Sequence, residues 1–277
     1  MANTMQMALK GGKMKVLTLS YDDGVIQDKR LVGILDKHGI KCTFNINTGL
    51  YYKGDTDPER GRMTHKSTVE LFKNSPHEVA VHAYTHPHLE LVDSANIIAE
   101  IIEDRKNIEK DYGVITRGMA YPFGTYNVNV VETLEKCGIV YSRTVYSKHN
   151  FQFPENWLTL HPTCHHKDPR LMELAKWFVE KPTEMCRNPE MFYLWGHSYE
   201  FDDDDNWNVI EEFCDYAGGK VDIWYATNIE VYDYVKAYEA LQSSFEKDMI
   251  YNPSTIDVWI KLNGKIMCVK AGETLYL

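Results

Sequence analysis

The chain lacks the features that mark an exported or membrane-bound protein. Its 277 residues contain no apolar run close to the ~18 residues that a membrane-spanning helix needs. Residues 1–12 include Lys10 but no apolar core, so they do not resemble a secretory signal. None of the six cysteines forms a Cys-x-x-Cys pair, which favours reduced thiols. We therefore expect a cytoplasmic protein with no membrane partner.

Positive charge is also scarce. Lys and Arg number 30 against 40 Asp and Glu, which gives a formal net charge of −10. This balance argues against a nucleic-acid partner or an anionic membrane, because both attract basic surfaces. It is compatible with a neutral or cationic substrate such as an amino sugar. The length and the hydrophobic share of 44% fit one large catalytic domain.

Short apolar segments alternate with amphipathic helical segments along most of the chain. The expected strands begin with the run from Val16 and continue at 42–46, 78–82, 118–121, 139–145, 158–161, 191–195 and 221–226. Helices are expected at 27–37 and 64–73, after a cap at Ser94, from Pro169, and at 229–241. This alternation predicts an α/β fold, a distorted (β/α) barrel with seven or so parallel strands.

The composition changes after Ser243-Ser244. Alternating residues on both sides of Asn263-Gly264 predict a β-hairpin, and a further strand is expected at 274–277. A tail of about 25 residues is too small to fold alone, so it should pack on the barrel. We therefore predict a barrel over residues 13–245 and a small β appendage over residues 250–277.

Two adjacent carboxylates, Asp22 and Asp23, end the first strand and precede Gly24. Neighbouring acids at a strand end are costly unless positive charge lies close to them. The carboxyl ends of strands are also where α/β folds place catalytic groups. The alternative is a turn in which Asp22 caps the next helix, and these residues alone do not separate the two.

A second polar cluster follows another strand. His82 and His86 are four residues apart on a loop that reaches Pro87. Two imidazoles at this spacing can meet at one ion, and zinc accepts neutral imidazoles with one carboxylate. The spacing alone often arises by chance. Because both clusters follow parallel strands, we expect them to converge as three metal ligands and one spare acid.

Together these residues resemble the motifs of the NodB-homology polysaccharide deacetylases, carbohydrate esterase family four. The Thr-Phe-Asp-Asp-Gly motif of that family is similar to residues 20–24, and its His-Ser/Thr-x-x-His motif to His82 and His86, with Ala83 in place of the hydroxyl residue. The Arg-Pro-Pro-Tyr-Gly motif is similar to residues 120–124, and Leu-x-His to residues 195–197. The resemblance covers roughly residues 14–242.

The resemblance implies a role for each of these residues. Asp23, His82 and His86 would bind one divalent metal, usually zinc. Asp22 would be the general base and His197 the general acid. The backbone N–H of Phe123 would stabilise the oxyanion.

These roles imply a metal-dependent hydrolase that removes N-acetyl groups from a saccharide containing an amino sugar. A metal with three protein ligands activates a water, a free carboxylate accepts its proton, and an acid protonates the departing amine. Two alternatives stay open: a related amidohydrolase acting on a small amide or ureide, and a member that binds carbohydrate without catalysis. The sequence does not indicate the sugar, the linkage or the oligomeric state.

The family's third motif begins with an arginine where this chain has Ala120. An arginine beside the base lowers its pKa and fixes its plane. Arg117 starts the same strand, about three residues or roughly 10 Å from its carboxyl end. Arg143 ends the next strand on the catalytic side, so we predict that Arg143 has taken over this role.

The remaining histidines and tryptophans carry weaker expectations. His165 and His166 lack a second pair that would complete a metal site, and their role is left open as part of the active-site wall. Surface or capping positions are expected for His38, His65, His77 and His149. Core positions are expected for Trp157, Trp195, Trp207 and Trp224, and a solvated loop for the acidic run 202–205.

Overall fold

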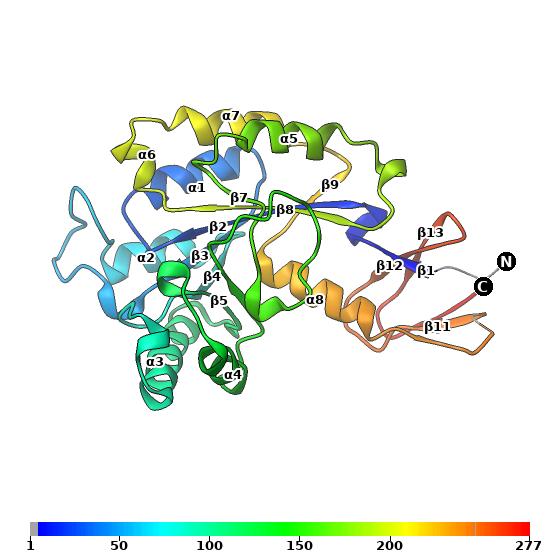
Figure 1. The fold of residues 1–277 in the computed structure, drawn as a ribbon, viewed down its shortest axis with the longest axis horizontal. Coiled ribbons are helices and arrows are strands. Elements are labelled where there is room, and N and C mark those ends of the chain that lie inside the picture. The colour runs from blue at the N-terminus through cyan, green and yellow to red at the C-terminus, as the bar shows by residue number, and fades with distance from the viewer. Residues whose placement is uncertain (1–4, 247) are drawn as a thin grey trace.

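A computed structural model describes residues 5–246 and 248–277. Its centre is one parallel sheet with the strand order β6-β5-β4-β3-β2-β8-β7, and β9 also pairs with β2 (Figure 1). The strands are β2 (Lys15–Asp22), β3 (Cys42–Ile46), β4 (Glu78–Val81), β5 (Gly118–Ala120), β6 (Tyr141–Arg143), β7 (Cys164–His165), β8 (Glu190–Gly196) and β9 (Ile223–Tyr225). The predicted α/β fold with a distorted parallel barrel is confirmed.

Helices cover both faces of this sheet. Figure 1 shows α1, α5 and α7 together on one side and α3 and α4 on the other. The helices are α1 (Asp28–Lys37), α2 (His65–Phe72), α3 (Ser94–Tyr112), α4 (Val128–Lys136), α5 (Leu171–Glu180), α6 (Glu200–Asp203), α7 (Asn208–Ala217) and α8 (Asn228–Glu239). Every residue of β2 is buried, as expected for a central parallel strand with helices on both faces.

The strand register decides which side chains meet at the carboxyl edge. Asp22 pairs with Asn45 of β3, and Tyr21 pairs with Gly196 of β8. Farther along the sheet, Ala120 pairs with Arg143. The carboxyl ends of β2, β3, β5, β6 and β8 therefore lie at one edge, where loops can gather polar groups.

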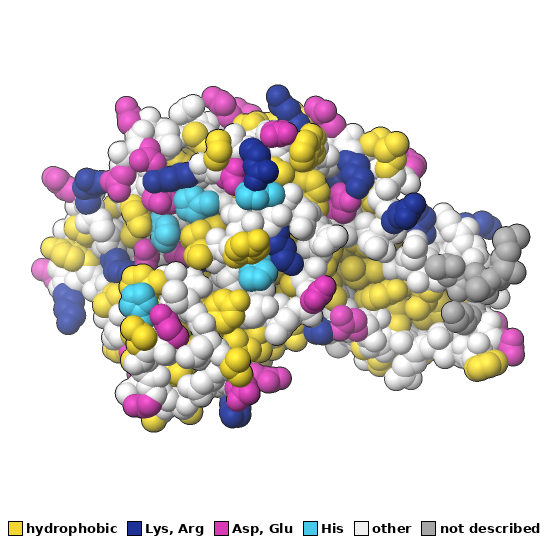
Figure 2. Space-filling model, in the orientation of Figure 1, with side chains coloured by type: hydrophobic (Ala, Val, Ile, Leu, Met, Phe, Trp, Pro, Cys, Tyr) yellow, Lys and Arg dark blue, Asp and Glu magenta, His cyan; other side chains and the backbone are white. Residues whose placement is uncertain are grey.

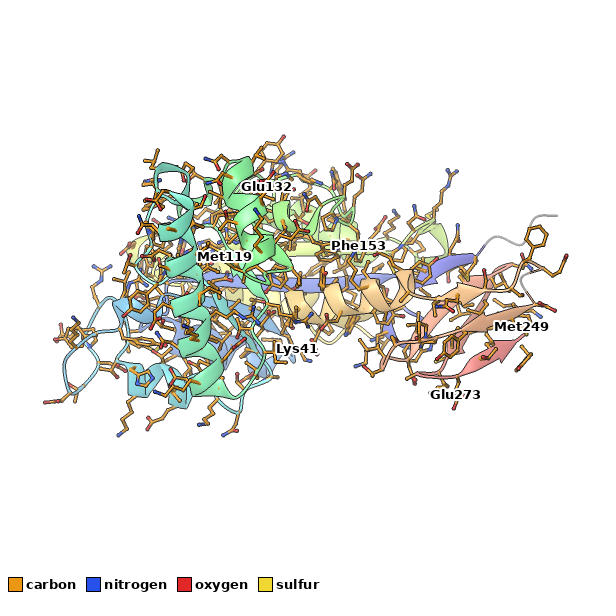
Figure 3. The ribbon with its side chains drawn as sticks, turned by 90° about the horizontal axis from the view of Figure 1, so that it is seen from below. Lys41, Met119, Glu132, Phe153, Met249 and Glu273 are labelled. Atoms are coloured by element: carbon orange, nitrogen blue, oxygen red, sulfur yellow. The ribbon has the colours of Figure 1, made fainter. Side chains whose placement is uncertain are left out.

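Two small antiparallel sheets lie beside the barrel and contain both ends of the described chain. One has the order β1-β12-β13, from β1 (Met5–Ala8), β12 (Val258–Leu262) and β13 (Lys265–Val269). The other has the order β10-β11-β14, from β10 (Gln242–Ser243), β11 (Met249–Tyr251) and β14 (Thr274–Tyr276). Figure 3 shows Met249 and Glu273 in this region, far from Met119 and Glu132 in the barrel.

The antiparallel region is fastened to the barrel through α8. Val258 and Ile260 of β12 pack with Ala237 of that helix in one buried apolar cluster. The Tyr234 hydroxyl donates to the Ala8 carbonyl at 2.7 Å and accepts the Trp259 N–H at 2.9 Å. One helix thus contacts both β1 and β12.

Several local expectations were right and others were wrong. The hairpin at Asn263-Gly264 is present, with Leu262 paired to Lys265 and positive φ angles of 50° and 83° at the two turn residues, as a two-residue turn of this kind requires. The strand predicted at 158–161 is wrong, because Trp157–Thr159 is a short 3₁₀ helix and the strand is β7. Ser94 is not the cap of α3; Asp93 accepts the Asn96 N–H instead.

Three further expectations concern burial and the chain ends. His77 is buried and accepts the Cys42 N–H, so its predicted surface position is wrong. Asp202 of the acidic run is exposed, but it belongs to α6 and accepts from Gln27 and Trp207. Of the stretch 1–12, residues 1–4 lie outside the described part of the chain, and β1 had not been predicted. Among the helices of the described residues, none has the length and apolar character that a membrane crossing requires.

Candidate active site

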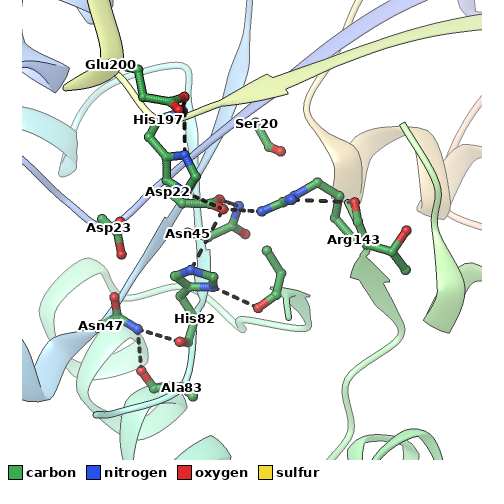
Figure 4. A network of polar contacts seen from close by, with 12 residues as sticks. Ser20, Asp22, Asp23, Asn45, Asn47, His82, Ala83, Arg143, His197 and Glu200 are labelled. Atoms are coloured by element: carbon green, nitrogen blue, oxygen red, sulfur yellow. Dashed lines mark hydrogen bonds and ion pairs between the residues drawn. The ribbon is translucent and has the colours of Figure 1, made fainter. Parts of the chain in front are cut away.

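Asp22 lies at the centre of the carboxyl edge. It is 2% exposed, its Oδ1 accepts from Asn45 Nδ2 at 2.8 Å, and its Oδ2 forms an ion pair with Arg143 Nη2 (Figure 4). Burial alone would raise the pKa of Asp22, but the Arg143 guanidinium, the neighbouring histidines and the Asn45 bond lower it to about 2. Asp22 is therefore a carboxylate at neutral pH despite its burial.

The arginine that holds Asp22 comes from β6. Arg143 is 1% exposed, and its guanidinium also stacks 4.1 Å from the ring centroid of Trp195. Arg117, the other candidate, is bound to Asp233 at 2.6 Å. The structure thus brings Arg143 and not Arg117 to Asp22; its effect on catalysis stays a prediction.

Asp23, His82 and His86 converge beside Asp22. Their ligand atoms all lie within 4.8 Å of one another. The loops that carry them use left-handed backbone, with φ of 86° at Asp23, 62° at Ala83 and 57° at His86. Residues other than glycine adopt such angles at a cost that surrounding contacts must offset.

Those contacts come from two neighbouring loops. Asn47 Nδ2 donates to the backbone carbonyls of His82 and Ala83, the latter at 2.7 Å. Arg62 pairs with the Asp23 carboxylate at 2.9 Å and donates to the Asp23 carbonyl. Asn47 therefore stabilises the turn at Ala83, and Arg62 stabilises the turn at Asp23.

The protonation of these histidines suits a metal. His82 Nδ1 lies 2.8 Å from the Ala120 carbonyl, and because a carbonyl only accepts, Nδ1 carries the proton and Nε2 keeps its lone pair. Burial lowers the pKa of His82, and that of His86 to about 4, so both imidazoles are neutral. Two neutral nitrogens and one carboxylate oxygen form a donor set that fits a divalent metal.

His197 approaches Asp22 from the opposite side, at the end of β8. Its Nε2 lies 3.9 Å from Asp22 Oδ2, and its Nδ1 lies 3.4 Å from Glu200 Oε2. Burial alone would lower the pKa of His197, but the carboxylates of Glu200, Asp22 and Asp23 raise it above its usual value. The protonated form of His197 is therefore favoured, and its imidazole faces the same space as the ionised Asp22.

A cavity of about 270 Å³ joins these groups. Its lining consists of Asp22, Asp23, His82, His86, Tyr121, Phe123, Gly124, Arg143, Val145, Trp195, His197 and Tyr199. Phe123 is half exposed, has a φ of 58°, and stacks on His88 with ring centroids 3.8 Å apart. In Figure 2, several histidine side chains gather over the barrel rather than over the antiparallel sheets.

Four supporting residues were missed from the sequence. Asn45 could have been noticed as a polar residue inside the apolar strand 42–46, and Glu200 as an acid three residues after His197. Arg62 stands in a polar loop with no distinguishing pattern. Asp104 lies in the middle of α3, yet it is fully buried and accepts the His82 N–H at 3.0 Å.

Comparison with known proteins bears on the family resemblance and on the fold. The sequence pattern of the polysaccharide deacetylase family matches residues 10–142. A probable peptidoglycan-N-acetylglucosamine deacetylase from Arthroderma benhamiae is 27% identical over 125 residues, which are 43% of this chain and 26% of that protein. The chain thus spans about a quarter of the length of this relative.

Solved structures share the fold at low identity. A putative polysaccharide deacetylase from Mycobacterium smegmatis has a TM-score of 0.61 at 16% identity, covering 84% of this chain and 94% of its own. A family 4 carbohydrate esterase from Streptomyces lividans, solved with acetate, has a TM-score of 0.52 at 16% identity, covering 76% and 91%. The resemblance of this chain to the NodB-homology polysaccharide deacetylases is confirmed.

Proposed function

We propose that the chain is a metal-dependent hydrolase that removes N-acetyl groups from a saccharide containing an amino sugar. One arrangement carries this proposal: Asp22, kept ionised by Arg143, lies between the Asp23–His82–His86 donor set and His197. Hydrolysis of an unactivated amide needs a base, an acid and a means of activating water, and these groups supply all three within one cavity.

Asp23, His82 and His86 would hold the metal. When bound, the metal supplies an activated water and polarises the acetamide carbonyl. The three side chains leave part of the coordination sphere to the cavity, where the substrate enters. Arg62, bonded to Asp23, fixes the direction of that carboxylate.

Asp22 accepts the proton of the attacking water. It is ionised but not a ligand, and one of its oxygens is fixed by Asn45 and the other by Arg143. Arg143 therefore both orients the base and keeps its pKa low, the role that the family assigns to an arginine at the position of Ala120.

His197 donates a proton to the departing amine, which is a poor leaving group unless it is protonated. The carboxylates around His197 raise its pKa and so favour the protonated form that this role needs. Phe123 lies at the cavity wall, and its backbone N–H would donate to the oxyanion that forms on the acetyl carbonyl oxygen.

The cavity and the relatives support this substrate class. A volume of about 270 Å³ suits one sugar residue with its acetamide, so the remainder of a saccharide would lie outside. The relative from Arthroderma benhamiae is named a probable peptidoglycan-N-acetylglucosamine deacetylase. A net charge of −10 is compatible with a product that carries a free ammonium group.

Acetate release tests this proposal. The zinc-loaded protein should release acetate from N-acetylglucosamine oligomers, stop when a chelator removes the metal, and recover when zinc is restored. Acetate release from small acetamides alone would instead support an amidohydrolase. Binding of the oligomers without any release would support a carbohydrate-binding protein.

A further inference from the structure

Three consecutive residues that begin with the last residue of β7 converge on the carboxylate of Glu200. His165 Nε2 lies 3.1 Å from Glu200 Oε2, His166 Nε2 lies 3.3 Å from the same oxygen, and Lys167 Nζ lies 3.3 Å from Oε1. Glu200 contacts His197 twice, at the backbone N–H (3.2 Å) and at Nδ1 (3.4 Å). Figure 4 shows Glu200 directly beside His197, on the side away from His82.

The cluster looks at first like a second metal site. The ligand atoms of His165, His197 and Glu200 all lie within 4.8 Å of one another. However, the Lys167 backbone N–H donates to His165 Nδ1 at 3.1 Å. An N–H can only donate, so Nδ1 presents its lone pair there and Nε2 carries the proton that faces Glu200. A metal bound here would need a lone pair on His165 Nε2, but that nitrogen carries the proton.

The same bond defines what His165 does. Its Nδ1 is occupied as an acceptor, so the ring is held as a neutral imidazole whose Nε2–H donates to Glu200. Lys167 supplies the positive charge on the other carboxylate oxygen. Glu200, fixed at both oxygens, accepts Nδ1–H of His197 and leaves Nε2 turned toward Asp22. His166 is buried and stacks on Phe201 with centroids 4.2 Å apart, so it packs behind the carboxylate.

We propose that His165 and Lys167 are positioning residues that act through Glu200 on His197. This inference rests on the proposed function, in which His197 is the general acid. In this proposal the tautomer of His165 is fixed, its Nε2–H donates to Glu200 alone, and His165 does not bind a metal.

A double-mutant cycle tests whether His165 acts through Glu200. His165→Leu should lower kcat about 10-fold or more with little change in KM, because the variant misplaces the acid His197 but leaves the substrate-binding groups intact. Glu200→Gln should lower kcat at least as much and move the alkaline limb of the pH–rate profile to lower pH, since a carboxylate that favours the imidazolium is lost. The other ionisable groups that lie around His197 in this pH test are Asp22, Asp23, His165, His166 and Lys167.

In the Glu200→Gln background, His165→Leu should have almost no further effect. Equal losses in both backgrounds would overturn the proposal. His165→Gln keeps an N–H near the position of Nε2 and should recover most of the loss. His149→Leu is the matched control, since His149 is also paired to a carboxylate, that of Asp168 at 2.5 Å, and should leave kcat unchanged.

Two measurements test the proposal without an activity assay. ¹⁵N spectra of the imidazoles should show His165 protonated at Nε2 and not at Nδ1, with the Nδ1–H signal of His197 shifted in Glu200→Gln. Equilibrium dialysis should find one equivalent of zinc in the wild type and in His165→Leu. A second equivalent that disappears in His165→Leu would overturn the proposal in favour of a metal site. If the wild type releases no acetate, the proposed function fails, and the spectra still test the positioning network.

Discussion

Two groups of histidines and carboxylates face each other across Asp22, and they differ in the polarity of one backbone contact. In the group formed by Asp23, His82 and His86, a carbonyl accepts from His82 Nδ1, so the lone pair of Nε2 points into the site. In the group formed by His165, His197 and Glu200, an N–H donates to His165 Nδ1, so the proton of Nε2 points inward. Similar donor atoms at similar separations thus present a lone pair, which a cation could accept, in the first group and a proton, which a hydrogen-bond acceptor needs, in the second.

The supporting backbone differs in the same sense. The first group stands on left-handed residues at Asp23, Ala83 and His86. In the second group, His165 ends β7, His197 directly follows β8, and Glu200 begins α6. Strain is found where three ligand atoms must converge on one point. Hydrogen bonds tolerate a wider range of distances and angles, so the second group can be held at the ends of regular elements without strained backbone.

The largest effect is expected when the carboxylate of the first group is removed. Asp23→Asn should reduce bound zinc to background and abolish acetate release, because an amide is a much weaker zinc ligand than a carboxylate. Metal analysis after dialysis and an acetate assay would measure both. Full metal content in this variant would refute the assignment of Asp23 as a ligand.

The neighbouring residue gives the matched control and the second largest effect. Asp22→Asn should keep one equivalent of zinc yet lose about 10²-fold or more in kcat, because only the proton acceptor is removed. Metal content and turnover are measured on the same samples. Loss of zinc here would mean that Asp22 belongs to the first group rather than between the two.

Arg143→Met tests what keeps Asp22 ionised between the groups. The pKa of Asp22 is lowered to about 2, and without the guanidinium its burial should raise it. The acid limb of kcat/KM should therefore move to higher pH by roughly 1–3 units. Arg117→Met, which breaks only the pair with Asp233, should leave that limb in place. An acid limb that stays fixed in Arg143→Met would contradict the proposed role.

The smallest effect concerns the support of the second group. Ser198, next to His197, donates to Asp28 Oδ1 at 2.5 Å, and burial raises the pKa of Asp28 to about 8. The folded protein therefore holds a proton that the unfolded chain releases near pH 4, so this stabilisation fades as the pH rises from about 4 to about 8. Asp28→Asn should remove that part of the pH dependence, as urea midpoints at pH 5 and pH 9 would show. An unchanged difference between the two midpoints would count against a protonated Asp28.

The sequence predicted those parts of the site that come from strand ends. Asp22, Asp23, His82, Arg143 and His197 all follow or end short apolar runs, and parallel register carries such positions to one edge. Arg143 could be chosen over Arg117 because the direction of a strand fixes which residue reaches that edge.

The remainder depended on contacts that no local pattern encodes. Arg62 reaches Asp23 from an irregular loop, and Asp104 is a buried acid within an otherwise amphipathic helix. The His165 tautomer is fixed by the backbone N–H of Lys167, and every residue other than proline has such a group. The strand β1 was missed because its partner is β12, at the other end of the chain.

That last pairing has a consequence for how the protein is made. Met5 lies opposite Leu262 in the antiparallel sheet, so two neighbours in one ladder are 257 positions apart along the chain. At about 5–20 residues per second, the first strand leaves the ribosome some 10–50 s before its partner exists. During that interval the barrel strands can already assemble, while β1 remains an unpaired edge next to the growing chain. Synthesis therefore sets the order of events: the barrel strands can assemble first, and the sheet of β1, β12 and β13 forms once β12 has emerged.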